Sequence, residues 1–202
     1  MTVIETRVLT IGHSNHPLET FISLLRQHGV TTLADVRSAP YSRFNPHFNR
    51  KSLDAALQAH GVAYLFLGHA LGGRPEDRSC YEKGRVRYDR LARTPLYREG
   101  VEQVIERAEV ERLALMCAEK EPLDCHRTLL VGRSLAERGV AVVHILADGT
   151  LEPHDDAMER LLNSVGLPAG DLLHSREELI EEAVALKEGR IAHTAKTPRK
   201  RR

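Results

Sequence analysis

The sequence predicts an α/β fold: a single domain with a mainly parallel, doubly wound (Rossmann-like) sheet of about five strands and helices on both faces. Two patterns predict it. Short apolar or β-branched runs alternate with longer segments whose apolar residues recur at helical spacing. Glycines such as Gly29, Gly61 and Gly139 end the helical segments. The chain has 202 residues, the length of one ordinary domain, and this alternation favours parallel strands joined by right-handed crossovers.

The expected strands are short runs that end in polar residues. Residues 8–11 are a β-branched run before Gly12, and residues 113–116 are a wholly apolar run before Cys117. Residues 32–37 end in charged side chains. The five predicted strands span residues 8–11, 32–37, 62–67, 113–116 and 140–146.

The expected helices follow each strand. Ser14 or Asn15 is expected to cap the first helix, with Pro17 in its first turn. The helix after the fourth strand is expected to begin at Cys125-His126-Arg127 and to end at Gly139. The predicted helices span residues 18–28, 51–60, 96–108, 125–138, 155–165 and 176–188.

Two segments are expected to be irregular, the Pro- and aromatic-rich residues 40–46 and the arginine-rich residues 69–96. We expect an α/β domain over residues 1–165, a peripheral C-terminal helix over residues 166–190 and a basic disordered tail over residues 191–202. Strand order and oligomeric state are not readable from the sequence.

Net charge is +1, but the charge is unevenly distributed. Residues 37–98 hold 12 Lys and Arg against 5 Asp and Glu, and the last seven residues hold five basic side chains. A local positive field favours an anionic partner, either a small molecule or nucleic acid. The alternative, of equal weight, is that these arginines are ordinary surface residues of a protein from an arginine-rich genome.

Three cysteines do not make a disulfide framework, and no apolar run reaches the roughly 20 residues that span a bilayer. The first residues lack the pattern of a signal peptide. We therefore expect a reduced, cytoplasmic protein without a membrane partner.

Polar side chains follow four of the predicted strands, so the carboxyl edge of the sheet is the expected site. The candidate groups at the four strand ends are His13 and Ser14, Asp35 and Arg37, Gly68 and His69, and Cys117 and Glu119. The expected alternative is an Asp35–Arg37 or Glu119–Arg127 ion pair that orders the loops. Cys125 can equally be a small buried hydrophobe. No Walker loop and no Gly-x-Gly-x-x-Gly follows a strand, so neither ATP nor NAD is favoured.

A set of motifs resembles the family called domain of unknown function 488, over about residues 8–145. The motifs are Thr10-Ile11-Gly12-His13-Ser14, Asp35-Val36-Arg37 with Pro40-x-Ser42-Arg43, Leu71-Gly72-Gly73, and Cys117-Ala118-Glu119 through Cys125-His126-Arg127. The resemblance implies a small cytoplasmic α/β protein of prokaryotes and no particular activity. It also implies the signature residues Asp35, Arg37, Ser42, Arg43, Cys117, Glu119, Cys125, His126 and Arg127.

Three functional hypotheses follow. The first is a hydrolase or transferase that acts at a glycosidic or ester bond of a phosphorylated, nucleotide-like or nucleic-acid substrate and needs no metal or other cofactor. In it Arg37, Arg43 and Arg127 bind the anion, Glu119 is base or nucleophile, and His126 carries a proton. The second is a thiol or metal protein that uses Cys117, Cys125 and His126. The third is a non-catalytic nucleic-acid-binding module formed by residues 37–98 and the tail.

Overall fold

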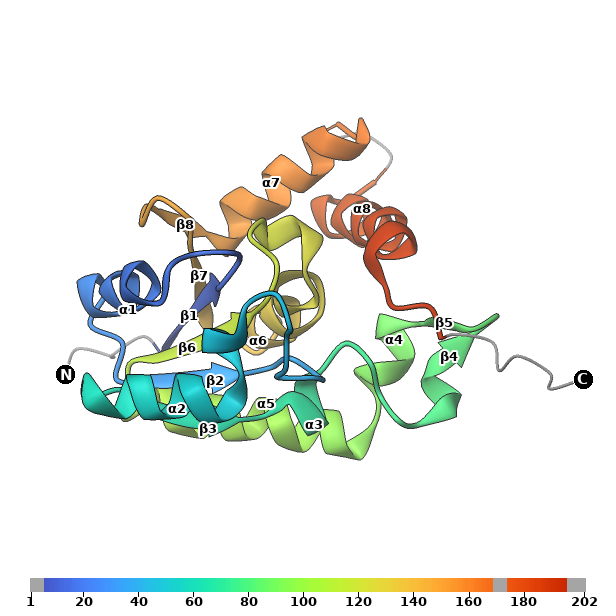
Figure 1. Cartoon of the computed structure of the whole chain (residues 1–202). Helices are drawn as coiled ribbons and strands as arrows, with labels where there is room; N and C mark the ends of the chain where they lie inside the picture. The colour runs from blue at the N-terminus through green and yellow to red at the C-terminus, as the bar shows by residue number, and fades with distance from the viewer. Residues whose placement is uncertain (1–5, 169–173, 196–202) are drawn as a thin grey trace, which may run out of the picture.

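A six-stranded sheet lies at the centre of the computed structural model, which describes residues 6–168 and 174–195 (Figure 1). The strand order is β3-β2-β6-β1-β7-β8, and every neighbouring pair is parallel except β7–β8. The strands are β1 (Arg7–Gly12), β2 (Thr32–Asp35), β3 (Ala63–Phe66), β6 (Leu113–Cys117), β7 (Ala141–Ile145) and β8 (Leu151–Pro153). The predicted fold class and all five predicted strands are confirmed. The sequence pattern missed β8 because it has three residues and ends in proline.

Helices cover both faces of the sheet because side chains alternate along its strands. On β1, Leu9 and Ile11 belong to one buried cluster and Val8 to the other. The first cluster lies beneath α1 (Leu18–Gln27) and α2 (Arg50–Ala59). The second lies beneath α5 (Pro95–Ala108), α6 (Arg133–Ala136), α7 (His154–Val165) and α8 (Arg176–Ile191).

The first helix begins differently from the prediction. Pro17 occupies the N-cap position of α1, and neither Ser14 nor Asn15 caps it. Ser14 has a positive φ of 49° and its backbone N–H donates to the carbonyl of Ala118, so it belongs to the loop at the sheet edge. The expected end of the helix is confirmed, because Gly29 has a φ of 64° that favours glycine.

Residues 69–96 are more regular than the sequence predicted. They include most of α3 (Gly68–Leu71), η2 (Arg78–Cys80) and α4 (Tyr88–Leu91). They also form a small antiparallel sheet of β4 (Tyr81–Glu82) and β5 (Arg85–Val86). Elements of two to four residues are too short to produce a recognisable periodicity.

The segment after α8 pairs with this small sheet, although the sequence predicted a disordered tail from residue 191. The Val86 N–H donates to the carbonyl of His193, and the Ala195 N–H donates to the carbonyl of Gly84 (2.7 Å). The expectation of disorder is therefore wrong for residues 191–195, and residues 196–202 lie outside the described residues. Figure 1 shows this segment beside β4 and β5.

Candidate active site

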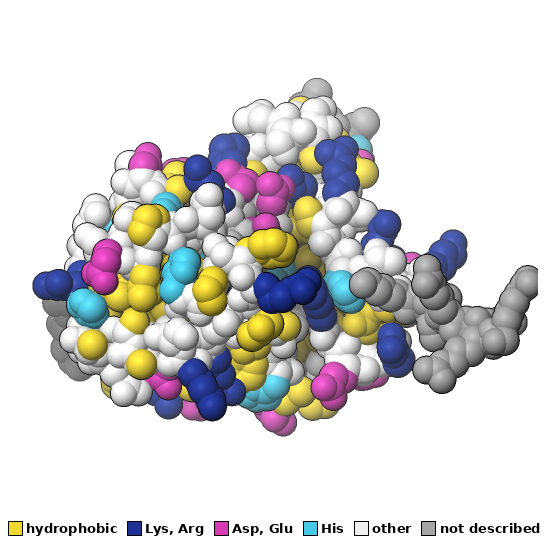
Figure 2. All heavy atoms as spheres, viewed as in Figure 1, with side chains coloured by type: hydrophobic (Ala, Val, Ile, Leu, Met, Phe, Trp, Pro, Cys, Tyr) yellow, Lys and Arg dark blue, Asp and Glu magenta, His cyan; other side chains and the backbone are white. Residues whose placement is uncertain are grey.

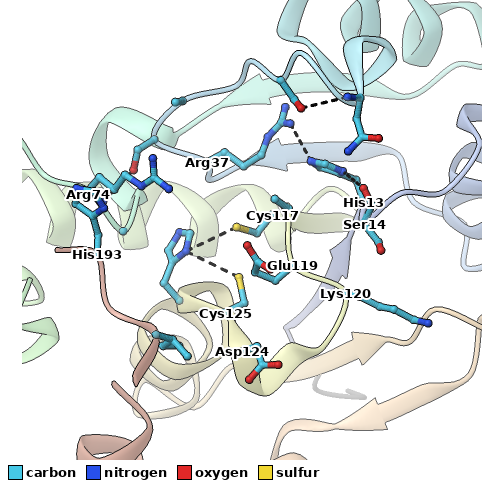
Figure 3. A pocket seen from close by; sticks show the side chains of 18 of the residues that line it. His13, Ser14, Arg37, Arg74, Cys117, Glu119, Lys120, Asp124, Cys125 and His193 are labelled. Atoms are coloured by element: carbon cyan, nitrogen blue, oxygen red, sulfur yellow. Dashed lines mark hydrogen bonds between the residues drawn. The ribbon is translucent and has the colours of Figure 1, made fainter. Parts of the chain in front are cut away.

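A cavity of about 730 Å³ opens at the carboxyl ends of β1, β2 and β6 (Figure 3). The predicted site residues that line it are His13, Ser14, Arg37, Ser42, Cys117, Glu119, Cys125 and His126. Asp35, Arg43 and Arg127, which were also predicted, do not line it. The strand ends converge because β1, β2 and β6 are parallel neighbours in the sheet.

Asp35 forms a buried ion pair with Arg37. Its two carboxylate oxygens accept hydrogen bonds from Nε (2.9 Å) and Nη2 (2.6 Å) of Arg37, and Tyr64 donates to the same carboxylate (2.7 Å). Nη2 also donates to the carbonyl of Phe48. This bidentate contact fixes the plane of the guanidinium. The geometry therefore supports the Asp35–Arg37 ion pair over a catalytic role for Asp35.

His13 is held between Arg37 and a backbone carbonyl. Its Nδ1 lies 2.8 Å from the carbonyl oxygen of Ser14, and Nη1 of Arg37 donates to its Nε2 (3.0 Å). A carbonyl only accepts and a guanidinium only donates, so this ring is neutral with its hydrogen on Nδ1. Burial, followed by the nearby Arg37 charge, lowers the pKa of His13 to about 4, which agrees with that tautomer.

Cys117, Cys125 and His126 form a compact cluster, hereafter the Cys-Cys-His cluster. Nδ1 of His126 lies 3.7 Å from Sγ of Cys117 and 3.9 Å from Sγ of Cys125. The other ring nitrogen, Nε2, lies 3.1 Å from the carbonyl of Val36 and must donate to it. In the neutral ring, Nδ1 therefore presents its lone pair to both sulfur atoms.

The backbone around Cys125 favours a thiolate. Cys125 directly precedes the helical turn of His126 and η4 (Arg127–Gly132), and the Arg127 N–H donates to Sγ of Cys125 (3.4 Å). Burial raises the pKa of the Cys125 thiol, but the hydrogen bond from Cys117 and the charge of Arg127 outweigh it and lower the pKa. The hydrogen bond to Cys125 and burial raise the pKa of Cys117.

Arg127 is fully buried and does not face the cavity. Its Nη1 donates to the carbonyl of Glu119 (2.6 Å) and its Nη2 to that of Lys120, so it holds the loop after β6. No carboxylate pairs with Arg127 among residues 6–168 and 174–195. Gly12 permits this packing, because a Cβ there would lie 1.8 Å from the Glu119 carbonyl oxygen.

Glu119 lines the cavity, and in Figure 3 its carboxyl group lies beside Cys117 and Cys125. Burial and the negative charge of Cys125 raise its pKa. Asp124 also lines the cavity but pairs with Lys187 (2.6 Å). Glu119 is therefore the acidic group available for proton transfer.

The loop after β2 forms one wall. Ser42 shapes that loop, because its Oγ accepts the N–H groups of Phe44 and Asn45. Arg43 is exposed on the outer side of the same loop, away from the cavity. Figure 2 shows basic and histidine side chains at the centre of the face viewed in Figure 1.

Sequence reasoning missed several lining residues, notably Arg74, Lys120, Tyr88 and His193. For Arg74 a signal existed, since it follows Gly72-Gly73, and adjacent glycines let the backbone approach a ligand closely. A Cβ on Gly73 would lie 3.1 Å from Cγ of His126, so this glycine also accommodates the imidazole ring. His193 had no signal, because it reaches the cavity only through pairing of the C-terminal segment with β5.

None of the described helices has the length and apolar character needed to cross a membrane.

Comparisons with known proteins identify a family and no individual relative. The family model described as "Domain of unknown function DUF488" matches residues 17–134, more than half of the chain. Neither a curated protein nor a solved structure matches the chain. The matched range includes the Cys-Cys-His cluster, Glu119 and the Asp35–Arg37 pair, and excludes His13 and His193. The chain therefore belongs to the DUF488 family.

Proposed function

We propose that this protein is an enzyme, a hydrolase or transferase, that acts on a small anionic substrate in the strand-end cavity. The observation that carries the proposal is Glu119: a carboxyl group with a raised pKa that faces a polar cavity beside Cys117 and Cys125. A carboxyl group that faces the cavity can exchange a proton with a bound substrate, and a raised pKa favours its protonated form.

The charge of the lining favours an anion. Arg37, Arg74 and Lys120 line the cavity, and Arg37 is paired with Asp35. Arg74 and Lys120 make no ion pair within the part of the chain that the structure describes, so their charges are available to a ligand. The anion-binding groups thus differ from the predicted set, because Arg43 is outside and Arg127 is occupied by backbone carbonyls.

In the proposed reaction, Arg74 holds the anionic group of the substrate, and Nη1 of Arg37 offers one further hydrogen. Glu119 gives a proton to the leaving oxygen or nitrogen, or takes one from an attacking water. His126 is not the proton carrier of the sequence-based hypothesis, because its Nε2 is occupied by Val36 and its Nδ1 faces the cysteines.

The test is a screen of the full chain against phosphate esters, nucleotides and N-glycosides, with Glu119→Gln as the diagnostic variant. Loss of one acid–base group lowers kcat by about 10²–10⁴-fold. We expect that loss in Glu119→Gln, and no loss in Glu99→Gln, whose carboxyl group is exposed on α5. Retention of the wild-type rate by Glu119→Gln, for a substrate that wild type turns over, would refute the assignment.

Thermal-shift binding supplies a second readout. A ligand at a hundredfold excess over its Kd stabilises the folded state by about 2.7 kcal/mol. The proposal expects such a shift with phosphorylated compounds, reduced in Arg74→Ala and kept in Arg93→Ala, an arginine outside the cavity lining. An equal thermal shift in both variants would show that the anion does not bind at Arg74.

A further inference from the structure

The three donor atoms of the Cys-Cys-His cluster have the geometry of a metal-binding site. They lie within 4.8 Å of one another, and the two S–N distances are 3.7 and 3.9 Å. Tetrahedral zinc, with Zn–S of about 2.3 Å and Zn–N of about 2.0 Å, places its sulfur and nitrogen ligands about 3.6 Å apart. Both S–N distances of the cluster are therefore within a few tenths of an ångström of those in a zinc site.

The imidazole of His126 is oriented as a ligand. Its Nε2–H donates to the Val36 carbonyl, which directs the Nδ1 lone pair toward both sulfur atoms. Metal-ligating histidines usually donate their other ring N–H to a carbonyl or carboxylate in this way. Gly73 leaves room for the ring in that orientation.

The surroundings favour the two thiolates of such a centre. Two thiolates and one divalent cation are together neutral, and the buried Arg127 adds a positive charge with no carboxylate partner among the described residues. The Arg127 N–H already donates to Sγ of Cys125, as backbone amides do toward thiolates at helix N-termini.

All three cluster residues line the cavity, so the fourth coordination position would face the substrate. Structural zinc sites are closed by four protein ligands, whereas catalytic sites keep three and leave one position open. A set of two thiolates and one imidazole favours zinc over magnesium or calcium, which prefer oxygen.

We propose that Cys117, Cys125 and His126 bind one zinc ion through two Sγ atoms and Nδ1, with an open position toward the cavity. The ligand set is independent of the reaction proposed above. Its use in catalysis rests on that proposal: the ion would polarise a substrate oxygen or a water beside Glu119. Cys117 and Cys125 would then serve as metal ligands and not as nucleophiles.

The experiment measures metal content and cobalt spectra of the full, untagged chain. After loading with Zn²⁺ and removal of excess ion, we expect about one equivalent in wild type. Co²⁺ in its place should give the sulfur-to-cobalt charge-transfer absorption and the d–d bands of tetrahedral coordination. Cys117→Ser and Cys125→Ser should each lose at least 90% of the bound metal, while circular dichroism shows that they remain folded.

Cys80→Ala is the matched control, because Cys80 is a buried cysteine outside the cavity lining. It should keep wild-type zinc and cobalt spectra. If the serine variants are unstable, His126→Gln and zinc protection of wild-type cysteines against iodoacetamide provide the same test.

Zinc below about 0.1 equivalent in wild type, or full retention by Cys117→Ser, would overturn the metal site. Rapid alkylation of Cys125 unaffected by zinc would also overturn it and assign a free nucleophilic thiol instead. Glu119→Gln separates the two proposals: it should retain zinc while losing activity. Metal binding without any activity would leave the site intact and remove the proposed reaction.

Discussion

Asp35 and Arg37 show how one residue pair prepares the site without performing chemistry in it. Asp35 has no exposed surface, and its carboxylate accepts from Arg37 and Tyr64. The guanidinium of Arg37, held in one orientation, lines the cavity. Its Nη1 donates to Nε2 of His13 and so positions that ring as well. The role that follows for Asp35 is positioning.

Replacing Asp35 should destabilise the fold strongly. Asp35→Ala leaves the Arg37 guanidinium buried without its counter-charge, and breaking a buried pair in this way typically costs about 3–5 kcal/mol. Urea denaturation measures the change. Glu137→Ala, which breaks the exposed pair with Arg133, should change the stability by less than about 1 kcal/mol. Equal effects of the two substitutions would contradict the proposed role of Asp35.

Gly12 illustrates a backbone constraint at the same scale. A Cβ there would overlap the Glu119 carbonyl, so the loop that Arg127 holds would have to move. We expect Gly12→Ala to lower the unfolding free energy by about 3 kcal/mol, the upper part of the range for overpacking. Gly189 lies in α8, and a Cβ there would meet only the side chain of Arg85, at 3.8 Å. Gly189→Ala should therefore be neutral or stabilising. Thermal unfolding of both variants distinguishes them, and an unchanged Tm for Gly12→Ala would argue against the close packing.

At the scale of elements, the strands of the sheet and their polar ends were predictable from the sequence. Leu113–Cys117 is entirely buried and apolar, and the residues after it are polar, which is the pattern of a central parallel strand that ends at a site. The arrangement of those ends was predictable too, because parallel strands place them on one edge. What each polar group does there was not predictable: Arg127 and Arg43 have the same chemistry as Arg74, but only Arg74 reaches the cavity.

The C-terminal segment is the element that sequence reasoning misjudged. Ile191 and His193 line the cavity because the segment 192–195 pairs with β5, and no local pattern encodes a contact across such a sequence distance. The segment lies outside residues 17–134, the range that the family model matches, and it adds a wall to the cavity.

Removing the His193 side chain from this wall should change the affinity for a ligand more than it changes the stability of the fold. His193→Ala removes a cavity-lining imidazole from an irregular segment while the backbone pairing with Val86 remains. For a ligand found by thermal shift, we expect Kd to rise about 3- to 10-fold, equivalent to roughly 0.7–1.4 kcal/mol for one polar contact. His60→Ala, at the C-cap of α2 and outside the cavity lining, is the control. Identical affinities for wild type and His193→Ala would exclude the segment from the binding site.

For the whole molecule, the acidity of buried histidines predicts how stability depends on pH. Burial is the largest cause that lowers the pKa of both His13 and His154 to about 4, against 6.5 for an exposed histidine. Between these values the unfolded chain binds protons that the folded chain does not. Stability should therefore be full above pH 6.5 and decline as pH falls toward about 4, by at most about 1.4 kcal/mol per pH unit for each histidine.

His154→Gln isolates one of these contributions. Glutamine can still hydrogen bond with His144, whose Nε2 lies 3.2 Å from Nδ1 of His154, but it does not titrate. Urea denaturation at pH 7.0, 5.5 and 4.5 should show a shallower loss of stability in the variant than in wild type. Parallel pH profiles for the two proteins would show that His154 is not neutral in the folded state.

The central structural claim is zinc binding by the Cys-Cys-His cluster at the edge of the cavity, whose residues come from β6 and from the turn before η4. X-ray absorption at the zinc edge of the loaded full chain tests it most directly. The account predicts two sulfur ligands at about 2.3 Å, one imidazole nitrogen at about 2.0 Å and one exchangeable oxygen or nitrogen ligand. A shell without sulfur, or one with a single sulfur ligand, would place the ion elsewhere and contradict the zinc site proposed for the cluster.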